Sequence, residues 1–338
     1  MKRHKRLLIL TAVLALVCLA TFALTRHQNK QDQLLEEAGV VAQISPESVL
    51  SFSWDTYDSG SYAFQRTDSG WKYLADDAFQ VSTAAMQTVL QGFTRLTASF
   101  MIPDVADFSQ YGLTNPKITL HLETAERTYT FKMGSFSQMD EHRYMDMGDG
   151  NVYLVSNDPA SRLSNDLSFL LKHDTIPAFS SVVDITFRGA ENYTVNCGAN
   201  NTYTTVRNGE TVQLDAGKIQ QYLSAISAVY LQNDADYNAT EDELKTFGLD
   251  DPDLIITVNY TYQNDAGETV SDACVLRICE DPEERAAADK VIAEGGVDNT
   301  VTKYIRVGDS PIVYQLQKTS YDALMACSYE DLSNQKGS

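Results

Sequence analysis

The sequence predicts an α+β protein of two tandem modules, each a mostly antiparallel sheet with one or two packed helices, behind a single N-terminal transmembrane helix. Three observations support this prediction. An uncharged apolar run opens the chain, a six-residue signature occurs twice, and an apolar, β-prone hairpin follows each copy. The copies are Tyr-Gly-Leu-Thr-Asn-Pro at 111–116 and Phe-Gly-Leu-Asp-Asp-Pro at 247–252, 136 positions apart. A repeat of domain length indicates a duplicated module.

The N-terminal segment predicts a membrane anchor. Eighteen uncharged residues run from Leu7 to Leu24, and a helix of that length spans about 27 Å, close to the thickness of a bilayer core. Four Lys or Arg residues precede the run and one follows it, which places the N-terminus in the cytoplasm and the main body outside. The alternatives are a cleaved signal ending at Ala20 or Ala23 and a lipoprotein at Cys18, where Val17 is an unfavourable neighbour. All three alternatives export the remaining chain.

The exported part is strongly acidic. Residues 1–26 hold five of the 26 Lys and Arg residues and none of the 46 Asp and Glu residues, so 21 bases face 46 acids beyond them, a net charge of −25. Such a surface repels nucleic acid and anionic headgroups, and neither is expected as a partner. A solvated acidic surface is the simplest interpretation, and cations or basic peptides remain compatible with it. The oligomeric state is left open.

The composition of the chain predicts five regions. Residues 1–26 form a basic stub and anchor, 27–44 a polar juxtamembrane spacer, 45–178 the first module, 179–332 the second module and 333–338 a tail. About 310 exported residues suit two domains of ordinary size.

In the first module, β-branched and aromatic residues between Asp, Ser and Gly turns predict a three-stranded meander. A helix capped by Ser82 or Thr83 follows, then four strands joined by Gly-containing turns, and a second helix at 158–171. The predicted strands are 49–54, 61–66, 71–74, 118–122, 128–133, 143–147 and 152–155.

The second module repeats this order. Asp215 is predicted to cap its first helix, and a short helix at 320–326 ends the module. One large insertion, 280–302, begins with Pro282 and has an Ala-rich body, which predicts an extra helix. The predicted strands are 182–187, 193–197, 203–206, 254–262, 269–279, 303–307 and 312–316.

The repeated signature predicts a structural hinge between helix and sheet. The aromatic residue and the leucine can anchor a loop in the core, the glycine can adopt a backbone conformation that other residues avoid, and the proline can start a strand without a ladder donor. These residues are Tyr111, Gly112, Leu113 and Pro116 in the first copy and Phe247, Gly248, Leu249 and Pro252 in the second.

These motifs resemble the DUF4340 family of uncharacterised bacterial proteins. The resemblance rests on the signature, the hairpin ending in Lys-Met-Gly at 132–134, Arg143-Tyr144 and Val-Tyr-Leu-Val at 152–155. It covers most of residues 44–332 as two modules, although the second has Cys279 where Gly134 would correspond. The resemblance implies a membrane-tethered, extracytoplasmic protein of unknown function, in some bacteria similar to components found beside ABC-type export systems. It implies no catalytic residues.

No metal site or cofactor is predicted. Asp234, Asp236 and Asn238 match three positions of an EF-hand loop, but Ala239 and Lys245 replace its decisive glycine and glutamate. No zinc motif, P-loop or dinucleotide motif is present. A second group could bind a cation weakly, but these residues are more simply interpreted as solvated turn residues. The group comprises Asp140, Glu141, His142, Asp146 and Asp149.

The exported histidines and cysteines form no catalytic motif. His121 faces away from its leucine neighbours on a predicted strand, which favours a solvent-side residue over a base. Buried free thiols are favoured for the cysteines; a bridge between Cys274 and Cys279 is not expected, and one from Cys197 or Cys327 stays open. The exported histidines are His27, His121, His142 and His173.

The function expected from these observations is non-enzymatic. The chain is expected to be a binding or scaffolding component of an envelope or ABC-type transport assembly, held in the cell membrane by a single N-terminal helix. The alternative is an envelope hydrolase that uses acidic residues in a cleft between the modules. Specialisation is expected in the insertion 280–302 and at the cysteines, where the two modules differ most.

Overall fold

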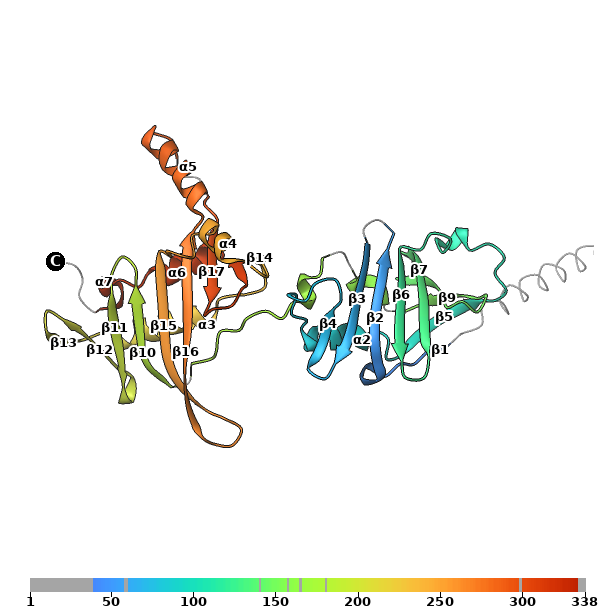
Figure 1. Ribbon diagram of the computed structural model, residues 1–338, viewed down its shortest axis with the longest axis horizontal. Coiled ribbons are helices and arrows are strands. Elements are labelled where there is room, and N and C mark those ends of the chain that lie inside the picture. The colour runs from blue at the N-terminus through green and yellow to red at the C-terminus, as the bar shows by residue number, and fades with distance from the viewer. Residues whose placement is uncertain are drawn as a thin grey trace, which may run out of the picture. The chain divides into compact units, whose positions relative to one another are not determined.

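The computed structural model describes residues 39–57, 60–139, 141–156, 158–163, 166–179, 181–297 and 300–333. The chain forms two compact units, and unit 1 ends at Leu170 where unit 2 begins at Leu171 (Figure 1). Within the ranges given, no helix is both long and apolar enough to span a membrane. The predicted anchor Leu7–Leu24 lies outside the described residues.

Unit 1 is a nine-stranded antiparallel sheet in the order β1-β5-β9-β8-β7-β6-β2-β3-β4. The side chains of Phe52 and Trp54 on β2 and of Phe64 on β3 are fully buried. Helix α2 (Thr83–Gln91) packs against it, and the N-cap Ser82 accepts a hydrogen bond from Ala85 N. The strands are β1 (Gly39–Ala42), β2 (Val49–Thr56), β3 (Gly60–Thr67), β4 (Gly70–Tyr73), β5 (Leu96–Ile102), β6 (Ile118–Thr124), β7 (Thr128–Ser137), β8 (His142–Asp146) and β9 (Val152–Val155).

Unit 2 is a second nine-stranded antiparallel sheet, in the order β13-β12-β11-β10-β15-β16-β17-β18-β14. Helix α3 (Ala216–Ser227), capped by Asp215, contacts α6 (Lys318–Met325), α7 (Tyr329–Leu332) and β12. The strands are β10 (Val182–Arg188), β11 (Tyr193–Gly198), β12 (Thr202–Arg207), β13 (Glu210–Gln213), β14 (Asp234–Asp236), β15 (Leu254–Gln263), β16 (Thr269–Glu280), β17 (Lys303–Val307) and β18 (Val313–Gln315).

The two sheets share one topology. Eight strands of unit 1, in the order β4-β3-β2-β6-β7-β8-β9-β5, match β12-β11-β10-β15-β16-β17-β18-β14 of unit 2. Unit 1 adds β1 beside β5, and unit 2 adds β13 beside β12. The pairing registers also agree, because β2 and β10 each carry an irregularity after their first residue, Val49 and Val182. The fold is therefore duplicated strand by strand.

This shared register gives each residue of one unit an equivalent in the other. Leu122 and Val258 stand at the same distance beyond the two signatures, and they pair with Phe52 and Ile185 respectively. Continuing across the sheet, Phe52 pairs with Phe64, and Ile185 pairs with Val195. These equivalences allow the two units to be compared position by position.

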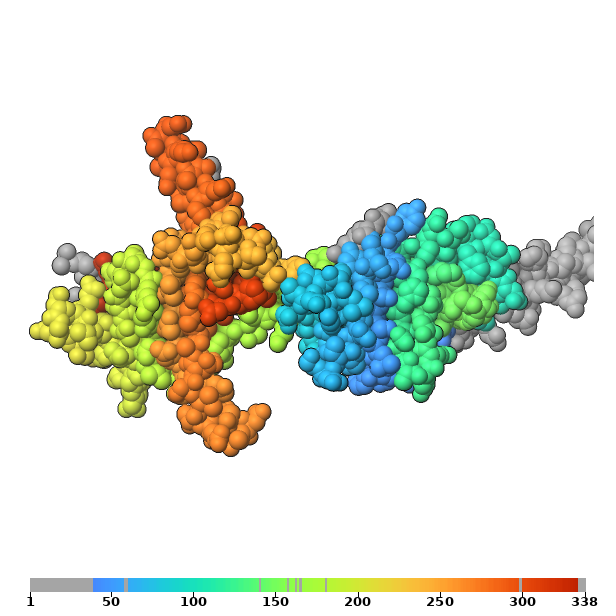
Figure 2. All heavy atoms as spheres, in the orientation of Figure 1, coloured from blue at the N-terminus to red at the C-terminus, as the bar shows by residue number. Residues whose placement is uncertain are grey.

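Most predicted elements are confirmed, including the helix of the insertion. This helix, α5 (Pro282–Ala293), has Pro282 in its first turn and Asp281 as its N-cap. It stands out from the body of unit 2 in Figures 1 and 2, with Ala288 as its buried residue.

The second helix predicted for the first module, at 158–171, is wrong. The chain there forms two short 3-10 turns, η3 (Pro159–Arg162) and η4 (Ser168–Leu170). Leu163 and Leu170 are buried, so the leucine spacing reflects burial of an irregular segment and not helical periodicity.

Several observed elements are additional to the prediction. Strand β1 lies inside the predicted spacer 27–44, because Gly39 to Ala42 pair with β5. The short helix α4 (Glu241–Thr246) has a complete capping box between Thr240 and Glu243. The remaining additional strands and α-helix are β5, β13, β14 and α7, and three 3-10 turns, η1 (Pro46–Ser48), η2 (Ser109–Tyr111) and η5 (Ala199–Asn201), are also additional.

Candidate functional site

The first copy of the signature shapes the entry of the chain into β6. Gly112 follows η2 (Ser109–Tyr111) with a φ of +69°, and a Cβ at this position would lie 2.5 Å from Ser135 Oγ. Leu113 is buried, and the Tyr111 ring lies 5.0 Å from that of Tyr144. Only glycine fits this close approach and left-handed backbone.

The second copy does the same in unit 2. Gly248 has a φ of +80°, Leu249 is buried, and the Phe247 ring lies 4.8 Å from that of Tyr304. The thiol of Cys279 donates a hydrogen bond to the Phe247 carbonyl at 3.0 Å.

The equivalent of Cys279 in unit 1 is Gly134. A Cβ on Gly134 would clash with the Tyr111 carbonyl. Pro116 and Pro252 each precede the first strand of the hairpin that follows. The eight signature residues thus divide between the units, four in each, and every copy contacts its own hairpin.

The residues considered as a weak cation site, Asp140 to Asp149, each interact with a different neighbouring side chain where the structure describes their contacts. Asp146 pairs with Lys132 Nζ at 3.1 Å, and Asp149 accepts a hydrogen bond from Tyr153 Oη at 2.5 Å. His142 lies 3.0 Å from Ser156 Oγ. Asp140 is outside the described residues.

The EF-hand-like aspartates and His121 also lie in regular strands of the two sheets. Asp234 and Asp236 lie in strand β14 and not in a loop. His121 contacts Thr130 Oγ1 at 3.1 Å and Asp55 at 3.7 Å on the open face of the sheet. Among the residues that the structure describes, no group of three or more His, Cys, Asp or Glu residues could hold a metal ion.

The hollow beside the second signature contains mostly paired charges. It has a volume of about 690 Å³ and borders Gly248, Cys279 and α5. Its Arg285 pairs with Asp289 at 2.8 Å and with Glu280 at 3.5 Å. Glu280 also pairs with the buried Lys303 at 2.9 Å. The Arg285–Glu280 pair joins α5 to the sheet, so this hollow is a structural junction.

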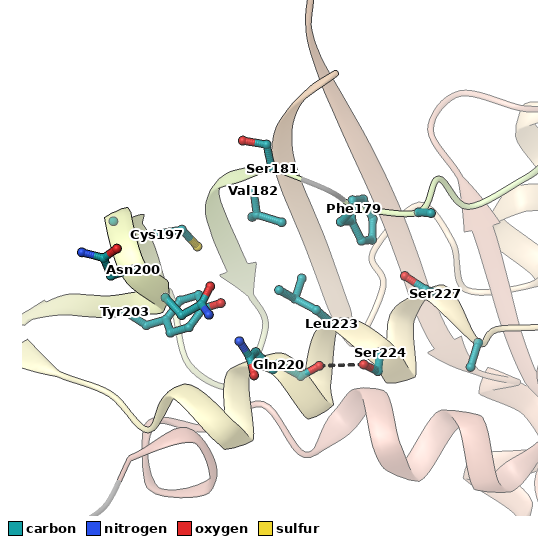
Figure 3. A pocket seen from close by; sticks show the side chains of 14 residues that line it. Phe179, Ser181, Val182, Cys197, Asn200, Tyr203, Gln220, Leu223, Ser224 and Ser227 are labelled. Carbon is teal, nitrogen blue, oxygen red and sulfur yellow. Dashed lines mark hydrogen bonds between the residues drawn. The ribbon is translucent and has the colours of Figure 1, made fainter. Parts of the chain in front are cut away.

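A larger pocket of about 830 Å³ lies in unit 2 between α3 and the ends of β10, β11 and β12 (Figure 3). In this view Phe179 and Tyr203 lie towards opposite ends, with Val182 and Leu223 between them. The lining residues are Ala178, Phe179, Ser181, Val182, Cys197, Gly198, Asn200, Asn201, Tyr203, Gln220, Leu223, Ser224, Ser227 and Ala228.

Unit 1 has a smaller hollow at the equivalent place. It measures about 470 Å³ and is lined by Pro46, Gln87, Gln91 and Thr94 among others. These four residues correspond by register to Phe179, Gln220, Ser224 and Ser227 of the unit 2 pocket. The groove is therefore common to both copies of the fold.

Arg66 closes the strand side of this groove in unit 1. Its Nε donates to the Val49 carbonyl and its Nη2 to the Pro46 carbonyl, both at 2.6 Å. The guanidinium also lies 4.7 Å from the centre of the Trp71 ring. The contacts hold this long side chain across the groove.

Unit 2 replaces this closure with smaller residues. Cys197 occupies the position of Arg66, since Phe64 and Val195 are equivalent and each lies two residues earlier. Tyr203 pairs with Cys197 as Trp71 pairs with Arg66. The pocket lining accordingly extends over β11 and β12 in unit 2.

The helix side of the groove also differs between the two units. Leu90 of α2 is 1% exposed, whereas its equivalent in α3, Leu223, is partly exposed and lines the pocket. The loop after β11 also departs, with Asn200 and Asn201 at φ of +57° and +56°. Asparagine is among the residues that tolerate this left-handed conformation best.

The Cys197 thiol is a poor nucleophile. Burial, with a smaller contribution from the Asp184 charge, raises its pKa to about 11. A thiol with this pKa is almost entirely protonated at neutral pH, and the thiolate is the reactive form. The four described cysteines are free, and burial raises the pKa of Cys274 and Cys327 to about 11 and of Cys279 to about 12. The pocket is therefore suited to binding more than to covalent catalysis.

Sequence reasoning did not identify the pocket. Its residues carry no motif. Specialisation is expected at 280–302 and at the cysteines; the insertion lies elsewhere in unit 2, whereas Cys197 lines the pocket. The signal that could have found it is the contrast between Arg66 and Cys197, which requires the two units to be aligned through their strand pairing.

Comparison with known proteins yields one family. The model of a domain of unknown function, DUF4340, matches residues 71–232. The matched stretch begins at Trp71 in β4, crosses from unit 1 into unit 2 and ends after α3. It includes every residue of the unit 2 pocket and, from unit 1, the ring that Arg66 covers. No curated protein and no solved structure matches the chain. The chain therefore contains a DUF4340 domain, matched over residues 71–232.

Proposed function

We propose that this DUF4340 protein is a non-catalytic binding protein whose ligand occupies the pocket of unit 2. In this proposal, Leu7–Leu24 anchors the chain in the cell membrane with both units outside the cytoplasm. The uncharged run and the preceding basic residues support the orientation. The binding protein acts within an envelope or ABC-type transport assembly, the setting that the family resemblance implies.

One observation carries the binding proposal. Two copies of one fold share a groove; in unit 1 Arg66 is hydrogen-bonded along its strand side and a hollow of about 470 Å³ remains, whereas unit 2 leaves about 830 Å³ open. Leu223 is partly exposed beside the open groove, whereas its equivalent in unit 1, Leu90, is buried. Unit 2 therefore lacks some of the hydrophobic stabilisation that burial of this leucine gives unit 1. A ligand in the pocket would restore that burial.

The hydrolase alternative has no specific support within either unit. Hydrolysis by a carboxylate pair needs two acids that converge on one substrate bond. Among the described residues, Asp146 is the one buried acid, and it is paired with Lys132.

Ligand retention tests the proposal directly. The full-length chain, purified in detergent, is incubated with a small-molecule extract of its cells, washed, and denatured to release bound compounds for mass spectrometry. We expect the wild type to retain at least one compound that Cys197→Arg loses, because arginine at this position reproduces the closure seen in unit 1.

The matched control is Arg66→Ala, which alters the equivalent position in unit 1 and should leave retention unchanged. Near-ultraviolet circular dichroism verifies that Cys197→Arg is folded. Identical sets of compounds on the wild type and Cys197→Arg would refute the binding proposal.

The topology has its own test. A cysteine is introduced by Asn29→Cys in a Cys197→Ser background, and intact cells are treated with a thiol reagent that cannot cross membranes. We expect labelling at this position and none at a Lys2→Cys control. Labelling of Lys2→Cys alone would show that the proposed orientation is wrong.

A further inference from the structure

The lining of the unit 2 pocket carries no ionised side chain. Its 14 residues include no Asp, Glu, Lys, Arg or His, in a chain with 46 acids and 26 Lys and Arg residues. An ion that moves from water into such a site finds no counter-charge to offset its lost hydration. The pocket therefore favours an uncharged ligand.

The same lining is rich in neutral polar groups. Asn200, Asn201 and Gln220 supply three carboxamides, and Ser181 and Ser227 supply hydroxyls. Within the described chain, no hydrogen bond to another residue occupies these five side chains. A carboxamide both donates and accepts, as a hydroxyl does, so these groups match a ligand that presents many hydroxyls.

Apolar surface completes the lining. The rings of Phe179 and Tyr203 lie towards opposite ends of the pocket, and Val182 and Leu223 lie between them in Figure 3. Tyr203 is 6% exposed, which fixes its ring in place. Such surfaces pack against the C–H face of a ring whose edge carries polar groups.

We propose that the unit 2 pocket binds an uncharged carbohydrate, an inference that rests on the proposed function. The sugar ring packs between the aromatic and aliphatic side chains, and its hydroxyls bond to the carboxamides and serines. Its volume of about 830 Å³ lies within the range of roughly 300–1,000 Å³ usual for small-molecule sites.

A neutral peptide is the competing ligand, and the geometry favours the sugar. Extended peptides are commonly bound by pairing with the free edge of a sheet. The pocket borders β10, β11 and β12, and β10 and β11 are paired on both sides while β12 lies between β11 and β13. Its hydrogen-bonding groups are side chains, which suits hydroxyl recognition.

Isothermal titration calorimetry on the full-length chain tests the inference. The detergent is lauryldimethylamine oxide, because a maltoside detergent would present sugar to the pocket. The neutral probes are maltose, cellobiose and N,N′-diacetylchitobiose; the charged probes are glucuronic acid and glucosamine; the peptide probe is N-acetyl-Ala-Ala-amide.

We expect at least one neutral disaccharide to bind about tenfold or more tightly than every charged or peptide probe, because a site built for hydroxyls discriminates strongly against ligands that leave its polar groups unpaired. Gln220→Leu, an exposed helix position, should weaken that binding about tenfold while the protein stays folded. Gln87→Leu is the matched control, since Gln87 is the equivalent residue in unit 1, and should change the Kd less than about twofold.

The outcomes separate the inference from the proposed function. Tighter binding of the peptide or of a charged sugar overturns the carbohydrate inference, as does failure of all three disaccharides. In either case the proposed function stands if compound retention still depends on Cys197. Failure of every probe together with retention that is unaffected by Cys197→Arg overturns both.

Discussion

The two units of this protein differ in the side chains that line one groove, which lies between the first helix and the strand ends of each unit. In unit 1, Arg66 reaches across the groove to two carbonyls and covers Trp71. In unit 2, the shorter Cys197 and Tyr203 leave the groove open. The strand order and register are the same, so side chains and the loop after β11, and not the sheet topology, account for the difference. After duplication, the groove of unit 1 is covered on its strand side by Arg66, whereas the groove of unit 2 is open.

A second difference concerns a buried cation on β8 and its equivalent β17. Arg143 binds both oxygens of Asp158 at 2.5 and 2.6 Å and donates to the Gly134 carbonyl at 2.7 Å. In unit 2 this position is Lys303, which pairs with Glu280 and donates to the Val301 carbonyl. Arginine makes a planar, bidentate pair, whereas lysine provides a point charge. Unit 1 therefore depends more on this one side chain.

The chain offers a separate probe of each unit. Both tryptophans, Trp54 and Trp71, lie in unit 1, and the four cysteines beyond residue 26 lie in unit 2. Tryptophan fluorescence thus reports unfolding of unit 1, and pulsed thiol labelling reports unfolding of unit 2.

The largest expected effect comes from Arg143→Ala. Removal of the cation leaves Asp158, 17% exposed, without its partner, and breaking a buried pair costs about 3–5 kcal/mol. We expect the urea midpoint from tryptophan fluorescence to fall by that free energy and the thiol-labelling midpoint to stay unchanged.

The equivalent variant, Lys303→Ala, provides the comparison. Glu280 would keep Arg285 at 3.5 Å, so we expect a smaller loss of about 1–3 kcal/mol, confined to unit 2. Equal losses in the two variants, or a shift of the other unit's midpoint, would contradict the proposed difference.

The next effect is alkaline destabilisation of unit 2. Burial raises the pKa of Cys274, Cys279 and Cys327 from an ordinary value of 9.0 to about 11, 12 and 11. The folded state therefore keeps these protons to higher pH than the unfolded state does. Their stabilising contribution is complete below pH 9 and is lost as the pH rises through 11 to 12.

In a Cys197→Ser background, which removes the half-buried thiol, we expect unit 2 to lose about 2.5 kcal/mol at pH 9.5 relative to pH 7.5, a little under 1 kcal/mol for each of the three buried thiols. The described residues of unit 1 include no cysteine, and unit 1 should change less. The measurement compares the two urea midpoints at both pH values, and Cys274→Ala should reduce the loss in unit 2 by about one third. A greater alkaline loss in unit 1 would show that the thiols do not control the difference.

The smallest expected effect is that of Arg66→Ala, which opens the groove of unit 1. The variant loses two charge-assisted hydrogen bonds at a partly buried site and a cation–π contact, and we expect unit 1 to lose about 1–2 kcal/mol. Trp71, now 7% exposed, should gain contact with water, and its emission should shift to longer wavelength. Unchanged emission would show that Arg66 does not cover the groove in solution. Cys197→Ala, the matched change in unit 2, should leave the emission as it is.

Local signals predicted the elements that depend on neighbouring residues. Ser82, Asp215 and Pro282 mark helix starts by capping chemistry that acts within one turn. Strand β13 had such a signal in Asn208-Gly209, whose positive φ values form the tight turn after β12. At 158–171, where the sequence predicts a helix, Asp158 is bound by Arg143 of β8 and caps only the short turn η3, and Leu163 and Leu170 are buried without helical geometry.

The sequence by itself determined the duplicated signature, the hairpins that follow it and the acidic character of the chain beyond residue 26. These features depend on residue type and short spacing, which act through backbone conformation and periodicity. Only the tertiary structure decided which hollow remains open. Arg66 and Cys197 become equivalent through strand pairing over long sequence separations, and the volume of a groove depends on every side chain that the fold brings to its walls.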